Sequence, residues 1–161
     1  MANIPIKAAV VTVSDSRTPD DDASGDELVE LLSSVGAEIV ERTIVSDDLV
    51  DIRETLHRLW QIEEINLIIA TGGTGFGPRD NTPEATRAII EREAPGMAEA
   101  IRRETASKTP MAMLSRAVCG IRGNTLIINF PGSPKGVREC FEVIRPVLNH
   151  AIDLINGNTL H

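Results

Sequence analysis

Apolar and polar residues alternate along this chain in a way that predicts strands and helices in turn. Continuous apolar runs, which are typical of strands covered on both faces, occur at residues 7–13 (KAAVVTV) and 66–71 (NLIIAT). Residues 37–45 form a third, partly alternating run. Each of the three is followed by a stretch with apolar residues at helical spacing, so the first half of the chain predicts repeated strand-helix units.

Residues at the expected helix starts support these assignments. Ser24, with Glu27 three residues later, predicts a capping box for the first helix, which Gly36 should end. Asp48 is the expected N-cap of the second helix. Thr82 and Pro83 predict a cap and a first-turn proline for the third.

The second half of the chain breaks the strand-helix alternation. We expect a shorter helix between Pro95 and Pro110, and two strand-like runs then flank Gly123 and Asn124, a hairpin signal. The segment PGSPKG at 131–136 opens a last apolar helix. The pattern therefore predicts an α/β three-layer sandwich, with a mostly parallel sheet and a local antiparallel hairpin, in a single domain over residues 1–161.

Charge restricts the possible partners. The formal net charge is −8 and the sequence pI is about 4.9, so the long-range field repels nucleic acid and anionic membranes, and we expect neither as a partner. An anionic ligand would have to be held by backbone amides, a helix N-terminus, a few cations or a metal ion. The two cysteines, Cys119 and Cys140, show no metal or redox spacing, which favours a reducing, cytoplasmic compartment.

Three loops at predicted strand ends carry unusual residues, namely SDSR at 14–17, TGGTGFGPRD at 71–80 and FPGSPKG at 130–136. Ligands of open α/β sheets bind beyond the carboxyl ends of the strands, so we expect these loops to converge. Glycine leaves backbone N–H groups unobstructed, and TGGTG could form an anion nest, although a tight turn without a ligand is the alternative. Neither a complete dinucleotide fingerprint nor a P-loop is present.

Acidic residues beside these loops suggest a metal ion. Asp47 precedes the expected N-cap Asp48 and is free to point into the cleft, and Asp80 follows Arg79 in the glycine loop. Two carboxylates near bound phosphates suggest Mg²⁺. For Asp80, a loop turn or an ion pair with Arg79 is the competing interpretation. In the other two loops, Ser14, Asp15 and Ser16 could be only a polar turn, and Lys135 only a surface charge.

The motifs together have a family resemblance. TVSDSR at 12–17, VSDD at 45–48, TGGTGFGPRDNTPEAT at 71–86 and LSRAVCGIRGNTLIINFPGSPKG at 114–136 occur in this order and spacing. In this the chain resembles the MogA/MoaB family of molybdenum-cofactor biosynthesis proteins, over nearly its whole length. The resemblance implies a molybdopterin-binding domain whose active members transfer AMP from Mg-ATP to the terminal phosphate of molybdopterin and release pyrophosphate.

The resemblance also implies roles for particular residues. Asp47 and Asp80 match the carboxylates linked to adenylylation, and we assign them as catalytic residues and as Mg²⁺ ligands. The residues that match walls of the substrate site are Ser14, Asp15, Ser16, Thr71, Gly72, Gly73, Thr74, Gly75, Arg79, Pro131, Gly132, Ser133 and Lys135. Ser46 departs from the proline that is common in the family, which suggests a looser hold on Asp47. The retained GPRD favours the active type.

Further expectations concern partners. The resemblance implies a homotrimer or homohexamer, and the molybdenum-insertion protein of the pathway as a partner. Two other classes of function stay open: a carrier that holds molybdopterin without turning it over, and an interaction domain that uses the fold only to build an oligomer.

Overall fold

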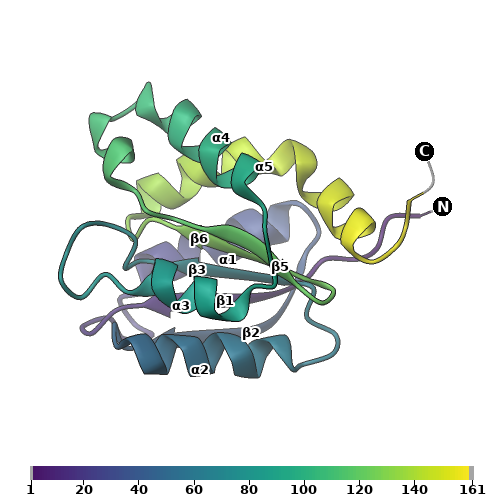
Figure 1. The fold of residues 1–161 in the computed structure, drawn as a ribbon, viewed down its shortest axis with the longest axis horizontal. Coiled ribbons are helices and arrows are strands. Elements are labelled where there is room, and N and C mark those ends of the chain that lie inside the picture. The colour runs from purple at the N-terminus through teal and green to yellow at the C-terminus, as the bar shows by residue number, and fades with distance from the viewer. Residues whose placement is uncertain (1, 160–161) are drawn as a thin grey trace.

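The computed structural model describes residues 2–159, which fold around one six-stranded sheet with strand order β2-β1-β3-β6-β5-β4 (Figure 1). The strands are β1 (Lys7–Val13), β2 (Glu38–Val45), β3 (Leu67–Thr71), β4 (Arg92–Glu93), β5 (Cys119–Arg122) and β6 (Thr125–Phe130). Pairing is parallel from β2 through β1 and β3 to β6, and antiparallel from β6 through β5 to β4. This confirms the mostly parallel sheet and its antiparallel hairpin.

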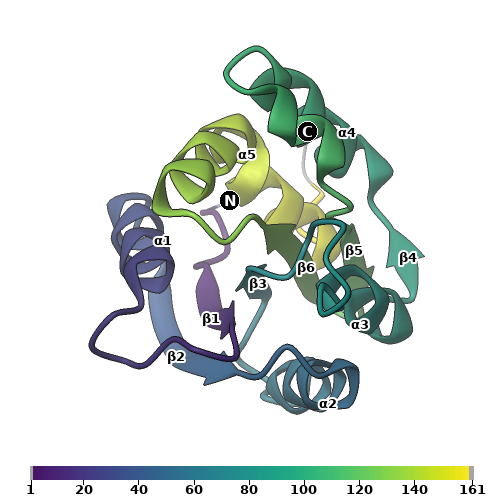
Figure 2. The same cartoon turned by 90° about the vertical axis from the view of Figure 1, so that its left-hand side faces the viewer.

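Helices cover both faces of the sheet, which confirms the three-layer arrangement. They are α1 (Ala23–Ser34), α2 (Leu49–Trp60), α3 (Thr82–Ile89), α4 (Pro95–Ala106), the 3-10 helix η1 (Pro110–Leu114) and α5 (Pro134–Ile155). Seen along the strands, α1 and α5 lie on one side and α2 and α3 on the other (Figure 2). None of the helices within residues 2–159 is both long and apolar enough to cross a membrane.

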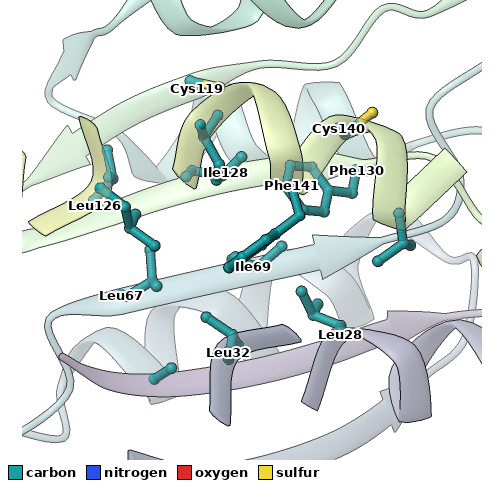
Figure 3. Packing of buried hydrophobic residues seen from close by; sticks show 14 of the residues in the cluster. Leu28, Leu32, Leu67, Ile69, Cys119, Leu126, Ile128, Phe130, Cys140 and Phe141 are labelled. Atoms are coloured by element: carbon teal, nitrogen blue, oxygen red, sulfur yellow. The ribbon is translucent and has the colours of Figure 1, made fainter. Parts of the chain in front are cut away.

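The hydrophobic core has two layers because successive residues of a strand point to opposite faces. In β3, Leu67 and Ile69 pack toward α1 and α5, whereas Ile68 and Ala70 pack toward α2 and α3. Figure 3 shows the first of these layers, in which Phe130 and Phe141 meet beside Ile69. Burial on both faces explains the continuous apolar runs of the sequence.

Two predicted helix caps are wrong. Helix α1 begins at Ala23, and its N-cap is Asp22, whose carboxylate accepts a 3.1 Å hydrogen bond from the Gly25 amide, so the Ser24–Glu27 box is not the cap. The fully buried Asp22 carboxylate also accepts from Thr12 Oγ1 at 2.9 Å and from Arg42 Nη2 at 3.0 Å, and these tertiary bonds hold the cap in place. In α3 the N-cap is Asn81, because the Thr82 hydroxyl donates to the Gly72 carbonyl instead.

The segment between β3 and β5 contains two elements that the sequence pattern did not predict. Strand β4 has only two exposed residues, and η1 is a single short turn of helix. Strand β5 runs against the parallel strands, so its first residue lies at the edge where β3 and β6 end. The chain segment that leads into β5 therefore reaches the carboxyl edge of the parallel strands.

Candidate functional site

The loops after β3 and β6 touch at the carboxyl edge of the sheet, which faces the viewer in Figure 2. The Gly72 amide donates a 3.0 Å bond to the Phe130 carbonyl, and Thr71 Oγ1 donates a 2.6 Å bond to the Pro131 carbonyl. A β-carbon added to Gly132 would lie 3.3 Å from Gly72 Cα. The glycines of both loops therefore permit a close approach of two backbones.

The loops after β1 and β2 are joined through two aspartates. The Asp15 amide donates to Asp47 Oδ2 at 2.8 Å, and the Asp47 amide donates to Asp15 Oδ1 at 3.0 Å. Asn81 Nδ2 donates to the Asp47 carbonyl at 2.9 Å, which ties this pair to the end of the glycine loop. The convergence of loops that the sequence predicts is therefore present.

The glycine loop has backbone amides that the fold does not use. Gly72 and Gly73 have φ of 103° and 66°, values that favour glycine. Among the described residues, the amides of Gly73, Thr74, Gly75 and Phe76 have no hydrogen-bond acceptor. Because adjacent free N–H groups are the donors of an anion nest, this part of the loop can bind an anionic oxygen.

Helix α3 holds the glycine loop from behind. Thr82 Oγ1 donates to the Gly72 carbonyl at 2.7 Å, and the Thr82 amide donates to the Gly73 carbonyl at 3.1 Å. A β-carbon at Gly73 would lie only 2.6 Å from Thr82 Oγ1. These two hydrogen bonds use the carbonyl groups of Gly72 and Gly73. In a trans peptide the N–H points away from the carbonyl, so the free amides that follow point away from Thr82.

Asp47 and Asp80 both lie beside this loop. A β-carbon at Gly73 would be 3.4 Å from Asp47 Oδ1, and one at Gly75 would be 3.0 Å from Asp80 Oδ2. Each carboxylate accepts one backbone amide through Oδ2, from Asp15 and from Gly77 respectively, and Oδ1 of each has no protein donor in the described part of the chain. Asp80 thus makes the predicted loop turn and still keeps an oxygen available.

These two carboxylates suit Mg²⁺, which takes one or two protein carboxylates and completes its shell with water and substrate phosphates. Within residues 2–159, no group of three or more His, Cys, Asp or Glu side chains could hold a metal ion. A site with only two carboxylates would depend on substrate oxygens, which is the usual arrangement for this ion.

Arg79 pairs with Asp15 rather than with Asp80. Its Nε donates to Asp15 Oδ2 at 2.7 Å, and its Nη2 donates to Asp15 Oδ1 at 3.0 Å. The Arg79 guanidinium lowers the pKa of the Asp15 carboxyl, whereas burial raises the pKa of Asp47. Asp15 is therefore held as an anion between the loops.

The remaining predicted site residues contribute mainly to loop structure. Ser14 Oγ accepts the amides of Ser16 and Arg17 at 3.2 and 3.1 Å, and Ser133 caps α5 by accepting the Gly136 amide at 3.0 Å. Lys135 is exposed, and its Nζ lies 3.8 Å from Glu139 Oε1.

Ser46 is fixed in place. Its hydroxyl donates to Asp51 Oδ2 at 2.7 Å and accepts the Asp48 amide at 3.1 Å, so a serine here also gives the loop before α2 a defined structure.

A cavity of about 340 Å³ continues from the glycine loop toward α4, η1 and α5. Thr74, Gly75 and Ser133 line its end at the sheet edge, and much of the remaining wall is apolar. The apolar wall includes Phe76, Ile101, Met111, Leu114 and Pro131. The arrangement offers amide donors at one end and an apolar slot at the other, which fits a ligand with an anionic group and a flat, less polar part.

Sequence reasoning missed Arg116, which contacts the glycine loop from the segment before β5. Its position follows from the reversed direction of β5, which no local pattern reveals. The only signal was its place in the motif LSRAVCGIRG.

Comparison with known proteins shows the family of this chain. Residues 9–150 match the family model described as a probable molybdopterin binding domain. The chain belongs to the MogA/MoaB family. It takes part in molybdenum cofactor biosynthesis.

Three relatives illustrate the range of the MogA/MoaB family. A molybdopterin adenylyltransferase of Helicobacter pylori strain J99 is 38% identical over 95% of this chain and 89% of its own length. The crystal structure of the molybdopterin biosynthesis enzyme MoaB from Thermus thermophilus is 43% identical, with a TM-score of 0.87 over 94% of this chain and 97% of its own. The molybdenum cofactor synthesis protein cinnamon of Drosophila melanogaster is 45% identical over 95% of this chain, which spans only 26% of that longer protein.

Proposed function

We propose that this chain is a molybdopterin adenylyltransferase, which transfers the adenylyl group of Mg-ATP to the terminal phosphate of molybdopterin. An oxygen of that phosphate attacks the α-phosphorus of ATP, the bond from the α-phosphorus to the bridging oxygen breaks, and pyrophosphate leaves. The observation that carries the proposal is the set of free amides in the glycine loop with Asp47 and Asp80 beside them.

The free amides explain how an acidic protein binds a phosphate. The net charge of −8 repels anions at long range, so affinity must come from close donors. Amides of Gly73, Thr74 and Gly75 would hold the attacking phosphate in one orientation, and Ser133 and the start of α5 lie at the same end of the cavity. Positioning of this kind lowers the barrier without a covalent enzyme intermediate.

Asp47 and Asp80 would hold the magnesium ion that accompanies ATP. When bound, the ion neutralises charge on the phosphates during transfer. The protein's own contribution is to keep one oxygen of each carboxylate directed to the site, through the amide bonds from Asp15 and Gly77.

The cavity beyond the glycine loop would take the pterin. Its volume of about 340 Å³ is within the range of small-molecule sites, and its apolar wall suits a flat ring system.

The test is pyrophosphate release from Mg-ATP with molybdopterin as acceptor. We expect Asp80→Asn and Asp47→Asn each to lower kcat/KM by about 100-fold or more, because charge stabilisation at a transferring group is usually a large term. Glu54→Gln, which removes an exposed carboxylate of α2, is the control and should keep parental activity. Full activity in Asp80→Asn would refute the role given to the carboxylate.

A carrier function predicts a different result from the same protein. The parent would then retain molybdopterin through gel filtration but form no pyrophosphate in the presence of Mg-ATP. The free oxygens of Asp47 and Asp80 favour the enzyme, since a carrier needs the amides but not two carboxylates near a bound anion.

A further inference from the structure

Arg116 joins the glycine loop to helix α3 with a single side chain. Its Nε donates to the Gly75 carbonyl at 2.7 Å, and its Nη2 donates to the Asp80 carbonyl at 2.7 Å. Its own amide donates to the Thr74 carbonyl at 2.8 Å. Arg116 therefore fixes the backbone at both ends of residues 75–80, the segment that carries the free Gly75 and Phe76 amides and the Asp80 carboxylate.

The remaining guanidinium nitrogen of Arg116 binds a carboxylate on α3. Nη1 of Arg116 pairs with Glu84 Oε1, and Glu84 lies in the first turn of α3, in the TPEAT part of the motif. The hydrogen bond from Arg116 lowers the pKa of Glu84, so the pair is ionised at neutral pH. Glu84 does not line the cavity, and its carboxylate accepts hydrogen bonds from Nη1 and Nη2 of Arg116, which orients the guanidinium.

The planar fork of arginine is needed for these contacts. Three nitrogens of one rigid group reach two carbonyl groups and one carboxylate, whereas a lysine ammonium is a single point on a flexible stem. All three nitrogens of the Arg116 guanidinium donate to protein acceptors, and these contacts use four of its five N–H groups.

We infer that Arg116, oriented by Glu84, is a positioning residue for the transfer reaction: it holds the Asp80 backbone and the free amides of the glycine loop in their working geometry. It acts through Asp80 and the loop and touches no reacting atom. The kinetic part of this inference rests on the proposed function, and the structural part does not.

The structural part can be tested by hydrogen exchange of the full chain without any ligand. Arg116→Lys should raise exchange of the Asp80 and Thr82 amides, which now donate to the Gly77 and Gly73 carbonyls, by about tenfold or more. The matched control is Arg58→Lys, because Arg58 makes a similar bidentate pair with Glu41 (3.0 and 2.6 Å) on β2 and α2. Unchanged exchange at both amides in Arg116→Lys would overturn the inference.

The kinetic part is tested by combining substitutions. Arg116→Lys should lower kcat by about 10- to 100-fold, with a smaller change in KM for ATP, because the groups remain but are misplaced. Glu84→Gln should give a weaker form of the same defect and keeps the side-chain shape, which guards against a folding failure of the first variant. Arg58→Lys should stay within about twofold of the parent.

A double variant separates positioning from general damage. If Arg116 acts through Asp80, Asp80→Asn with Arg116→Lys should be no more than about twofold slower than Asp80→Asn alone. If the two substitutions lower kcat by factors that multiply, the inference is wrong. It is also wrong if Arg116→Lys speeds hydrogen exchange but leaves kcat unchanged. If the parent forms no pyrophosphate, the proposed function fails, while the exchange experiment still decides whether Arg116 orders the loop.

Discussion

Two glycine-containing turns of this molecule, the loop after β3 and the hairpin turn between β5 and β6, use glycine in different ways. In the hairpin, Gly123 has φ of 52°, and its amide donates to Glu91 Oε2 at 3.2 Å. The neighbouring Arg122 guanidinium stacks 4.0 Å above the Trp60 ring. In the loop after β3, Gly73 has a similar φ of 66°, but its amide has no acceptor within the described residues.

The difference shows that positive φ alone does not mark a ligand site. Gly123 in the hairpin allows the positive φ of the turn, and its amide is hydrogen-bonded. The loop after β3 also has glycines at positive φ but leaves several amide donors free, among them the amide of the buried Thr74, and buried polar groups are normally paired. Unpaired donors at a strand end are therefore the stronger sign of function.

The largest effect should come from a methyl group in the glycine loop. Gly73→Ala would place a β-carbon 2.6 Å from Thr82 Oγ1 at a φ that alanine rarely adopts, so the loop must move. We expect pyrophosphate release per folded molecule to fall by about 100-fold or more. Gly123→Ala should lower the free energy of unfolding by about 1–2 kcal/mol, measured with urea, and leave activity intact. Equal losses of activity in Gly73→Ala and Gly123→Ala would show that the two turns do not differ in function.

An intermediate effect is expected where the loops after β3 and β6 meet. Gly132→Ala would bring a β-carbon 3.3 Å from Gly72 Cα and push the two backbones apart by a fraction of an ångström. Activity should fall by about tenfold, mostly through KM, because the wall of the site moves while the carboxylates stay. Gly96→Ala, in the first turn of α4 with nothing within 4 Å of its β-carbon, is the neutral control.

The smallest effect concerns the pH dependence of stability. Because Arg116 lowers the pKa of Glu84, the ionised pair stabilises the fold above the ordinary value of 4.5, and this contribution is lost as pH falls through the lowered pKa. Glu84→Gln should cost less than about 1 kcal/mol at pH 7, since the Glu84 side chain is 44% exposed, and nothing at low pH.

Glu41→Gln, at the pair with Arg58, should show the same pH dependence, because Arg58 lowers the pKa of Glu41 in the same way. Urea unfolding at several pH values checks both variants. Only Glu84→Gln should also lower kcat, and a loss of activity in Glu41→Gln would show that the two pairs are not distinct in function.

The sequence predicts most of the fold because burial on both faces leaves a clear signal. The run at residues 7–13 and the hairpin at Gly123 were both confirmed. Strand β4 could not be predicted, since two exposed residues carry no periodicity. The predicted cap of α1 was wrong: Asp22, two residues before Ser24, caps the helix, and its carboxylate is also held by Thr12, ten residues away in the chain.

Part of the candidate site could also be predicted, because some of its residues lie close to strand ends in the sequence. Gly73 and Asp47 each lie two residues after a strand, and Asp80 lies in the same loop as Gly73, so all three could be named from local sequence. The partner of Arg79 could not, because Asp15 lies 64 residues away. Arg116 lies 41 residues from Gly75, and only the three-dimensional path of the chain brings them together.

Strand β5 has a consequence for how such a site can be built. In a purely parallel sheet, every chain segment at the carboxyl edge follows a strand. The segments that precede strands all lie at the opposite edge. A strand of opposite direction places an entering segment among the leaving ones, and here that segment delivers Arg116. Antiparallel insertion thus lets a compact chain put supporting side chains behind its working loops, without lengthening the loops themselves.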